Sequence, residues 1–121
     1  MFDPHEQTVR RFAAAWRRRD SAALEAVLGD DAVATCDGGD PEPAPAGTVR
    51  GATEVARLVI GIMGGRADAE LTVESVNGRA GLALRHTSRA VAVVGAETAG
   101  SRITTLWIVL NPAKLTAWHR G

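Results

Sequence analysis

Hydrophobic residues recur at helical spacing near the start of the chain. The apolar stripe of this first segment consists of Val9, Phe12, Ala13 and Trp16. Asp3 is a typical N-cap, and Pro4 suits the first helical position because its missing N–H has no partner there. We therefore predict a helix over residues 4–19.

Two more helices are predicted in the first half of the chain. A short one starts at Asp20 or Ser21 and ends at Gly29, and its stripe consists of Leu24, Val27 and Leu28. A longer one is stopped by Gly64-Gly65, and its stripe consists of Val55, Leu58, Val59, Ile62 and Met63. Each helix has an apolar side that must be buried against another layer.

Strands are predicted after these helices. The β-rich segments are residues 31–37, 49–51 as a short strand or turn, 70–77, 80–94 and 102–110. Asn77-Gly78 is a hairpin signal, and residues 95–100 are expected to form the turn before the last strand. The long segment 80–94 is either bent by a bulge or broken at Thr87-Ser88. This order indicates an α+β fold, in which three helices pack on one face of a curved antiparallel sheet.

Length and charge narrow the class of protein. The chain has 121 residues, 45% of them apolar, and a formal net charge of zero, which fits a single domain over residues 1–121. The balanced charge makes direct nucleic-acid binding unexpected. The apolar runs are too short to cross a membrane and no signal peptide is seen, so we expect a cytoplasmic protein. The single cysteine, Cys36, excludes an internal disulfide and is interpreted as a small buried residue.

Two polar segments, far apart in the sequence, each follow a predicted strand. The first is Asp37-Gly38-Gly39, and the second is Asn111-Pro112-Ala113-Lys114-Leu115. Glycine admits backbone angles closed to other residues and proline removes a ladder donor, so both segments end their strands. We interpret them as the rim of a cup formed by the curved sheet.

Asp37 and His86 are the candidates for a catalytic base. Asp37 ends a strand beside glycines that let a ligand approach the backbone, although aspartate before glycines is also a routine turn residue. His86 shares its alternation with Leu82 and Leu84, so it points into the cup if they do. A lone strand histidine is more often a satisfied core or rim group. The remaining histidines form no metal-ligand spacing with it, so we predict no metal and no cofactor.

The tryptophans are candidates for the core and the cup. Trp16 lies on the apolar side of the first helix, and Trp107 has the same parity as Ile103 and Val109 in the last strand, so both are predicted to be core residues. With His86, they are the side chains expected to line an apolar cavity. Trp118 follows the last strand and is expected to pack back across the mouth of the cup, with an exposed anchor for a partner as the alternative.

Two kinds of enzyme site set different requirements. An isomerase site needs a carboxylate base and a hydroxyl or protonated acid that holds the enolate, and the chain has no tyrosine for that role. An epoxide hydrolase site needs two acids bridged by an arginine around one water. The strand residues available for it are Asp37, Glu70, Glu74 and Arg102. Alternation does not fix which way they face, so catalysis stays open at this point.

An ordered set of short pieces runs almost from end to end of the chain: Phe2-Asp3-Pro4, Leu28-Gly29-Asp30-Asp31, Asp37-Gly38-Gly39, Val49-Arg50-Gly51-Ala52, Val76-Asn77-Gly78-Arg79-Ala80-Gly81-Leu82, Arg102-Ile103-Thr104 and Asn111-Pro112-Ala113-Lys114-Leu115. This set resembles the SnoaL-like branch of the nuclear-transport-factor-two fold, which implies a cone-shaped, curved antiparallel sheet closed by three helices. More narrowly, it resembles the C-terminal domain of sigma-J-type extracytoplasmic-function sigma factors. The chain departs from that group where it has Asp40 and Pro41 in place of a glycine and a lysine, and Ala113 in place of an acid.

The resemblance implies regulation rather than catalysis. In such sigma factors the extra domain acts in place of a separate anti-sigma factor, so sigma regions and RNA polymerase are the expected partners if the chain is fused to them. The rim residues expected to contact them are Asp37, Gly38, Gly39, Asn111, Pro112, Lys114 and Leu115. A small apolar ligand in the cavity is a further expected partner. The alternatives are a stand-alone enzyme of the ketosteroid isomerase, polyketide cyclase or epoxide hydrolase type, and a sheet-to-sheet homodimer.

Overall fold

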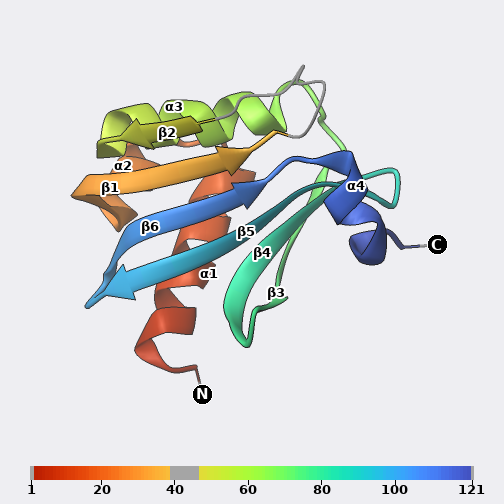
Figure 1. Cartoon of the computed structure of the whole chain (residues 1–121). Coiled ribbons are helices and arrows are strands. Elements are labelled where there is room, and N and C mark those ends of the chain that lie inside the picture. Colours follow the sequence, from red (N-terminus) through yellow and green to blue (C-terminus); the bar gives the residue numbers. More distant parts are fainter. Residues whose placement is uncertain (1, 39–46, 121) are drawn as a thin grey trace.

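The computed structural model describes residues 2–38 and 47–120, and it contains a curved sheet with the three longer helices against one face (Figure 1). The helices are α1 (Pro4–Arg17), α2 (Ser21–Val27), α3 (Ala52–Met63) and α4 (Pro112–Leu115), followed by the 3-10 turn η1 (Thr116–Trp118). The strands are β1 (Leu28–Asp37), β2 (Gly47–Arg50), β3 (Glu70–Val76), β4 (Arg79–His86), β5 (Arg89–Ala99) and β6 (Arg102–Val109). Six strands form one sheet in the order β2-β1-β6-β5-β4-β3. The predicted α+β architecture is confirmed.

The sheet is mixed rather than wholly antiparallel. Strands β1 and β6 pair in parallel, with Asp37 beside Val109, and the other neighbouring strands pair antiparallel. Two strands joined by a short hairpin turn must pair antiparallel, and the turn signals in the sequence identify only such pairs. Pairing between strands remote in the sequence depends on how the helices return the chain to the sheet, which alternation does not encode.

Two glycines act differently from the prediction. Gly29 lies within β1 rather than ending α2, and a Cβ at this position would come within 3.3 Å of the carbonyl oxygen of Ile103. Gly29 therefore lets β1 approach β6. Strand β5 continues to Ala99, so the turn before β6 is at Gly100, where φ is 59°, and not over the whole of residues 95–100.

The hairpin turns follow the sequence signals. Asn77 and Gly78 have φ values of 52° and 84°, as expected for a tight turn of the type that suits twisted strands. The long segment 80–94 is broken at Thr87 and Ser88, whose φ values are 51° and 70°. Positive φ is costly for a β-branched residue such as Thr87, so the packing around this turn must stabilise it.

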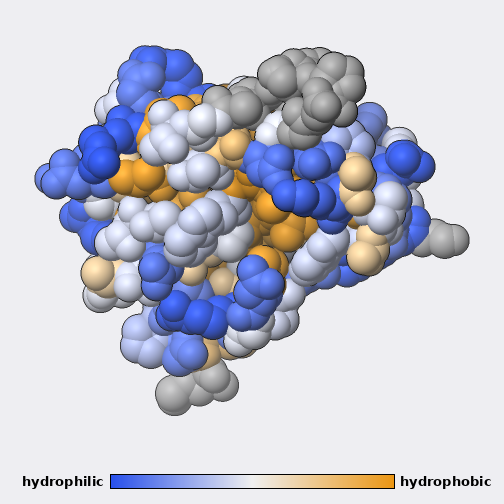
Figure 2. Space-filling view, in the orientation of Figure 1, coloured by the Kyte–Doolittle hydropathy of each residue, from blue (hydrophilic) through white to orange (hydrophobic). Residues whose placement is uncertain are grey.

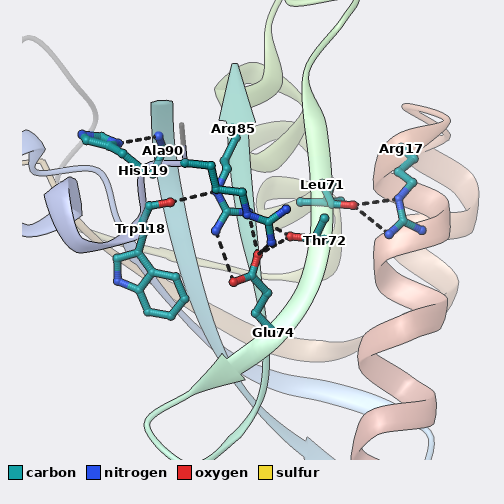
Figure 3. A network of polar contacts seen from close by, with 9 residues as sticks. Arg17, Leu71, Thr72, Glu74, Arg85, Ala90, Trp118 and His119 are labelled. Carbon is teal, nitrogen blue, oxygen red and sulfur yellow. Dashed lines mark hydrogen bonds and ion pairs between the residues drawn. The ribbon is translucent and has the colours of Figure 1, made fainter. Parts of the chain in front are cut away.

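The main core lies between the sheet and helices α1, α2 and α3. Trp16 is fully buried in it and donates its indole N–H to the carbonyl of Val59, 2.8 Å away, which joins α1 to α3. Arg17 donates from Nε and Nη2 to the carbonyl of Leu71, at 3.1 and 2.8 Å, which joins α1 to β3 (Figure 3).

A second, smaller core covers part of the other face of the sheet. It consists of Ala83, Ala90, Val93 and Leu115. Ala83 alternates with Leu82 and Leu84 of the main core, so the second core lies on the face turned away from α1. Trp118 packs against it. The tail therefore packs back onto the fold as expected, but onto this outer face.

A buried arginine holds the C-terminal tail in place (Figure 3). Arg85, with 3% of its side chain exposed, donates from Nε to the carbonyl of Trp118 at 2.8 Å. Its Nη1 and Nη2 donate to the two carboxylate oxygens of Glu74 at 2.5 and 3.2 Å. Arg120 Nη2 approaches the same carboxylate at 3.1 Å, and the backbone N–H of Ala90 donates to Nδ1 of His119 at 2.8 Å. The tail is thus tied to β3, β4 and β5 by polar contacts.

Glu74 is held as an anion in this network. The hydrogen bonds from Arg85 lower the pKa of Glu74 from 4.5 to about 2, against the opposing effect of burial. Because the pKa is lower in the folded chain, the contribution of Glu74 to stability is fully present above about pH 4.5 and is lost as the pH falls toward about 2.

We predict that Glu74→Gln lowers the free energy of unfolding by about 2 kcal/mol at pH 7, because the buried guanidinium loses its counter-ion. The difference from wild type should shrink at pH 3, and urea unfolding followed by tryptophan fluorescence measures it at both pH values. The control is Glu54→Gln, which removes an exposed ion pair with Arg57 and should cost less than about 0.5 kcal/mol. An equal loss at both pH values would contradict this account.

We also predict opposite effects of alanine at two glycines. At Gly81 a Cβ would lie 2.7 Å from a methyl carbon of Val76 and closer still to the carbonyl oxygen of Val94, so Gly81→Ala should cost about 2 kcal/mol of stability. At Gly61, inside α3, nothing lies within 4 Å, so Gly61→Ala should stabilise the fold by about 0.5 kcal/mol. Thermal unfolding followed by circular dichroism compares the two variants, and destabilisation by both would count against the prediction.

Candidate functional site

The two predicted rim segments meet at one end of the sheet. Because β1 and β6 are parallel, their C-terminal ends lie side by side, and the N–H of Leu110 donates to the carbonyl of Asp37 at 2.7 Å. Lys114 Nζ donates to Asp37 Oδ2 at 2.6 Å. Both side chains of this ion pair are partly exposed. Gly39 lies outside the described residues. Gly38, which was also predicted to lie on this surface, is buried. We call the surface formed by Asp37, Asn111, Pro112 and Lys114 the rim.

A short helix gives the second rim segment its shape. Asn111 accepts the N–H of Ala113 on its side chain at 3.0 Å, and Pro112 occupies the first position of α4. One side of this turn is apolar, and Leu115 is 2% exposed within the second core. Leu115 therefore supports the rim from beneath and presents no surface to a partner, unlike the prediction, while Lys114 points outward.

A cavity of about 380 Å³ lies next to the rim. Its nitrogen-bearing lining residues are Arg66, His86, Arg89 and His119. Its apolar lining residues include Val91, Leu110, Pro112 and Leu115. The cavity thus brings His86 together with part of the second rim segment, and it has both a cationic and an apolar side.

The other two residues predicted to line a cavity lie elsewhere. Trp16 is fully buried in the main core, as predicted for its helix. Trp107 is 47% exposed, so its predicted place in the core is wrong. The pairing of β5 with β6 shifts register between Glu97 and Thr98, so the alternation set by Ile103 is not kept along β6 and Leu106 is the next buried residue.

Trp107 instead lies on the face of the sheet that the helices leave open. Figure 2 looks at this side and shows hydrophobic surface among pale and hydrophilic residues. A Cβ at Gly95 would meet the indole ring of Trp107 at 3.7 Å, so the ring lies along the strand next to it. The sheet-to-sheet homodimer would use this face, and it stays a prediction.

His86 forms a hydrogen-bonded pair at the edge of the cavity. Its Nε2 lies 2.8 Å from Oδ1 of Asp68, and the histidine side chain is 37% exposed. His86 is the last residue of β4, and its orientation toward the side of Leu82 and Leu84 stays a prediction. An imidazole oriented by a carboxylate can donate one proton and accept another.

The acid and arginine cluster of the sheet is not the one that the sequence suggested. Arg102 donates to the carbonyl of Leu28 at 3.4 Å, away from Glu74. Arg85 is the partner of Glu74, and Glu70 stands opposite Arg85 in the β3–β4 pairing. Arg85 was missed, although a charge inside the apolar run of β4 is a signal that a partner must be present. This cluster faces the tail, so it acts as a structural clamp.

Three lining residues of the cavity were also missed: Arg66, Arg89 and His119. Their sequence neighbourhoods are turns and the tail, and only the folded tail brings them together. Cys36 is buried as predicted, and burial raises the pKa of its thiol. Within residues 2–38 and 47–120, no group of His, Cys, Asp or Glu side chains is arranged to hold a metal ion, and no helix is long and apolar enough to cross a membrane.

Comparisons with known proteins place this geometry in a known fold. No protein-family model and no curated protein matches the sequence. The crystal structure of the extracytoplasmic function sigma factor SigJ of Mycobacterium tuberculosis matches 95% of the chain, with 24% identity and a TM-score of 0.72. The chain spans only 45% of the length of that protein.

Two further solved structures match the chain over most of their own length. An LEH-like epoxide hydrolase of M. tuberculosis has 20% identity and a TM-score of 0.55, covering 95% of this chain and 90% of that one. An NTF2-like protein of Burkholderia xenovorans has 22% identity and a TM-score of 0.59, covering 95% of each chain. The chain has the SnoaL-like, nuclear-transport-factor-two-like fold.

Proposed function

We propose that this chain is a regulatory domain of an extracytoplasmic-function sigma factor, and that its rim contacts the sigma regions. The observation that carries the proposal is the joining of Asp37 and Lys114 across 77 residues of sequence into one exposed surface. The likeness to SigJ over 95% of the chain supports the same role. A domain with this role works in the cytoplasm, beside RNA polymerase.

The rim has the properties of a docking surface. It presents an acid, a cation and a proline on one surface, on backbone held by the hydrogen bond from Leu110 to Asp37 and by the Asn111 cap. A pre-formed surface lowers the entropy lost on binding. The exposed carboxylate and ammonium can also pair with charges on a partner, which favours specificity and fast association.

We predict that Lys114→Ala weakens binding of the chain to the sigma regions about fivefold, because an interfacial charge and its orienting contact are lost. Biolayer interferometry on an immobilised extracytoplasmic-function sigma factor that lacks this domain measures the dissociation constant. Arg57→Ala is the matched control, since it also removes one exposed ion pair, but on α3. The proposal fails if the wild-type chain does not bind, or if both variants bind alike.

A small-molecule enzyme is a second candidate function, favoured by the His86–Asp68 pair beside the cavity. In such an enzyme His86 takes a proton from substrate or water, and Asp68 orients its ring. The enzyme hypothesis predicts turnover of an apolar epoxide such as styrene oxide, followed by chromatography of the diol, and a loss of about 100-fold in His86→Gln. Equal turnover by His86→Gln, with an unchanged circular dichroism spectrum, would remove His86 as the base.

A further inference from the structure

The cavity beside the rim has an uneven distribution of charge. Arg66 and Arg89 line it, whereas the acid nearest to Arg66 in sequence, Asp68, is bound to His86 through Oδ1. The guanidinium of Arg66 is positioned by a 2.8 Å hydrogen bond from Nη1 to the carbonyl of Ile62. Within the part of the chain that the structure describes, Arg89 has no ion pair. The cavity therefore carries a positive charge that its own lining does not neutralise.

Hydrogen-bond donors also exceed acceptors among these side chains. Nδ1 of His119 accepts the N–H of Ala90, so the neutral ring carries its proton on Nε2 and donates from there. Arginine has five donors and no acceptor. The hydroxyl of Thr87, another lining residue, already donates to the carbonyl of His86 at 2.6 Å. A ligand that fits this set must supply acceptor oxygens.

The remaining wall is apolar. Val91 packs at the edge of the main core, Leu110 belongs to the main core and Leu115 to the second core. The cavity thus lies where the two cores meet, between the β4–β5 turn and α4. Its volume of about 380 Å³ falls within the range of small-molecule sites.

We propose that this cavity binds a small molecule that has an apolar body and one carboxylate. The carboxylate pairs with Arg66 and Arg89, because a guanidinium offers paired donors that match its two oxygens. The apolar body lies against Val91, Leu110 and Leu115, where it gains from leaving water.

Occupation of the cavity also stabilises the rim. Pro112 and Leu115 belong to the cavity wall and to α4, the helix that carries Lys114. A ligand that packs on them favours the conformation in which α4 is docked and Lys114 faces Asp37. This step rests on the proposed function, whereas the binding of the ligand does not.

The test is a titration of the ¹⁵N-labelled chain with octanoate, octan-1-ol and acetate, followed by amide chemical shifts. Octanoate should saturate and shift Ala90, Leu115 and His119, with a dissociation constant at least tenfold lower than that of octan-1-ol or acetate. The proposal would be overturned if octanoate bound no more tightly than octan-1-ol, or no more tightly than acetate. It would also be overturned if the chemical-shift changes were confined to residues outside the cavity.

A matched pair of arginine variants completes the test. Arg89→Gln should weaken octanoate about fivefold and leave octan-1-ol unchanged, because only the carboxylate contact is lost. Arg50→Gln, at an exposed position of the edge strand β2 and outside the cavity lining, should change neither. Equal octanoate affinity in both variants would refute the role of Arg89. The titration needs no sigma regions and the Lys114→Ala assay needs no ligand, so each proposal fails separately.

Discussion

A guanidinium buried to 3% exposure must find acceptors within the fold, and the arrangement of the C-terminal end depends on this constraint. Arg85 satisfies it with Glu74 and with the carbonyl of Trp118, which fixes the tail against the sheet. The docked tail places Leu115 in the second core and His119 at the cavity. Lys114, between the strand end and this tail, is then held beside Asp37. The buried charge of Arg85 in β4 thus helps to set the position of the rim, which lies at the C-terminal ends of β1 and β6.

The rim depends on a second constraint, the parallel pairing of β1 with β6. In an antiparallel pair, Asp37 and Asn111 would lie at opposite ends of the sheet. In parallel pairing both strands end at the same edge, and the Leu110 N–H completes the ladder on Asp37. The clamp at Arg85 and this ladder act on the two ends of the segment 110–118. The segment is therefore fixed at both ends, although α4 itself has only four residues.

The sequence predicted what local periodicity controls and missed what depends on contacts remote in the sequence. The stripe ending at Trp16 and the Asn77-Gly78 turn identified a helix and a hairpin, and the structure has both. Trp107 was predicted in the core from strict alternation with Ile103, whereas the β5–β6 register irregularity, where Thr104 of β6 is the extra residue, breaks that alternation. Arg66, Arg89 and His119 carry no common motif, and they share a cavity only because the tail folds back. The rim segments were found because glycine and proline mark strand ends, but their meeting was not encoded in either segment.

The packing of the interior explains why a ligand site would lie at the edge of this fold. Trp16 and Phe12 fill the space between α1 and the sheet with tilted rings 5.7 Å apart, and the indole N–H is satisfied by Val59. Between these two rings and the sheet, a ligand of several carbon atoms would displace core contacts. The cavity beside α4 is bordered by residues of both cores and by part of the rim. A molecule bound there touches the wall that supports Lys114, so the proposed ligand and the proposed partner contact are coupled to the extent that the ligand favours the docked position of α4.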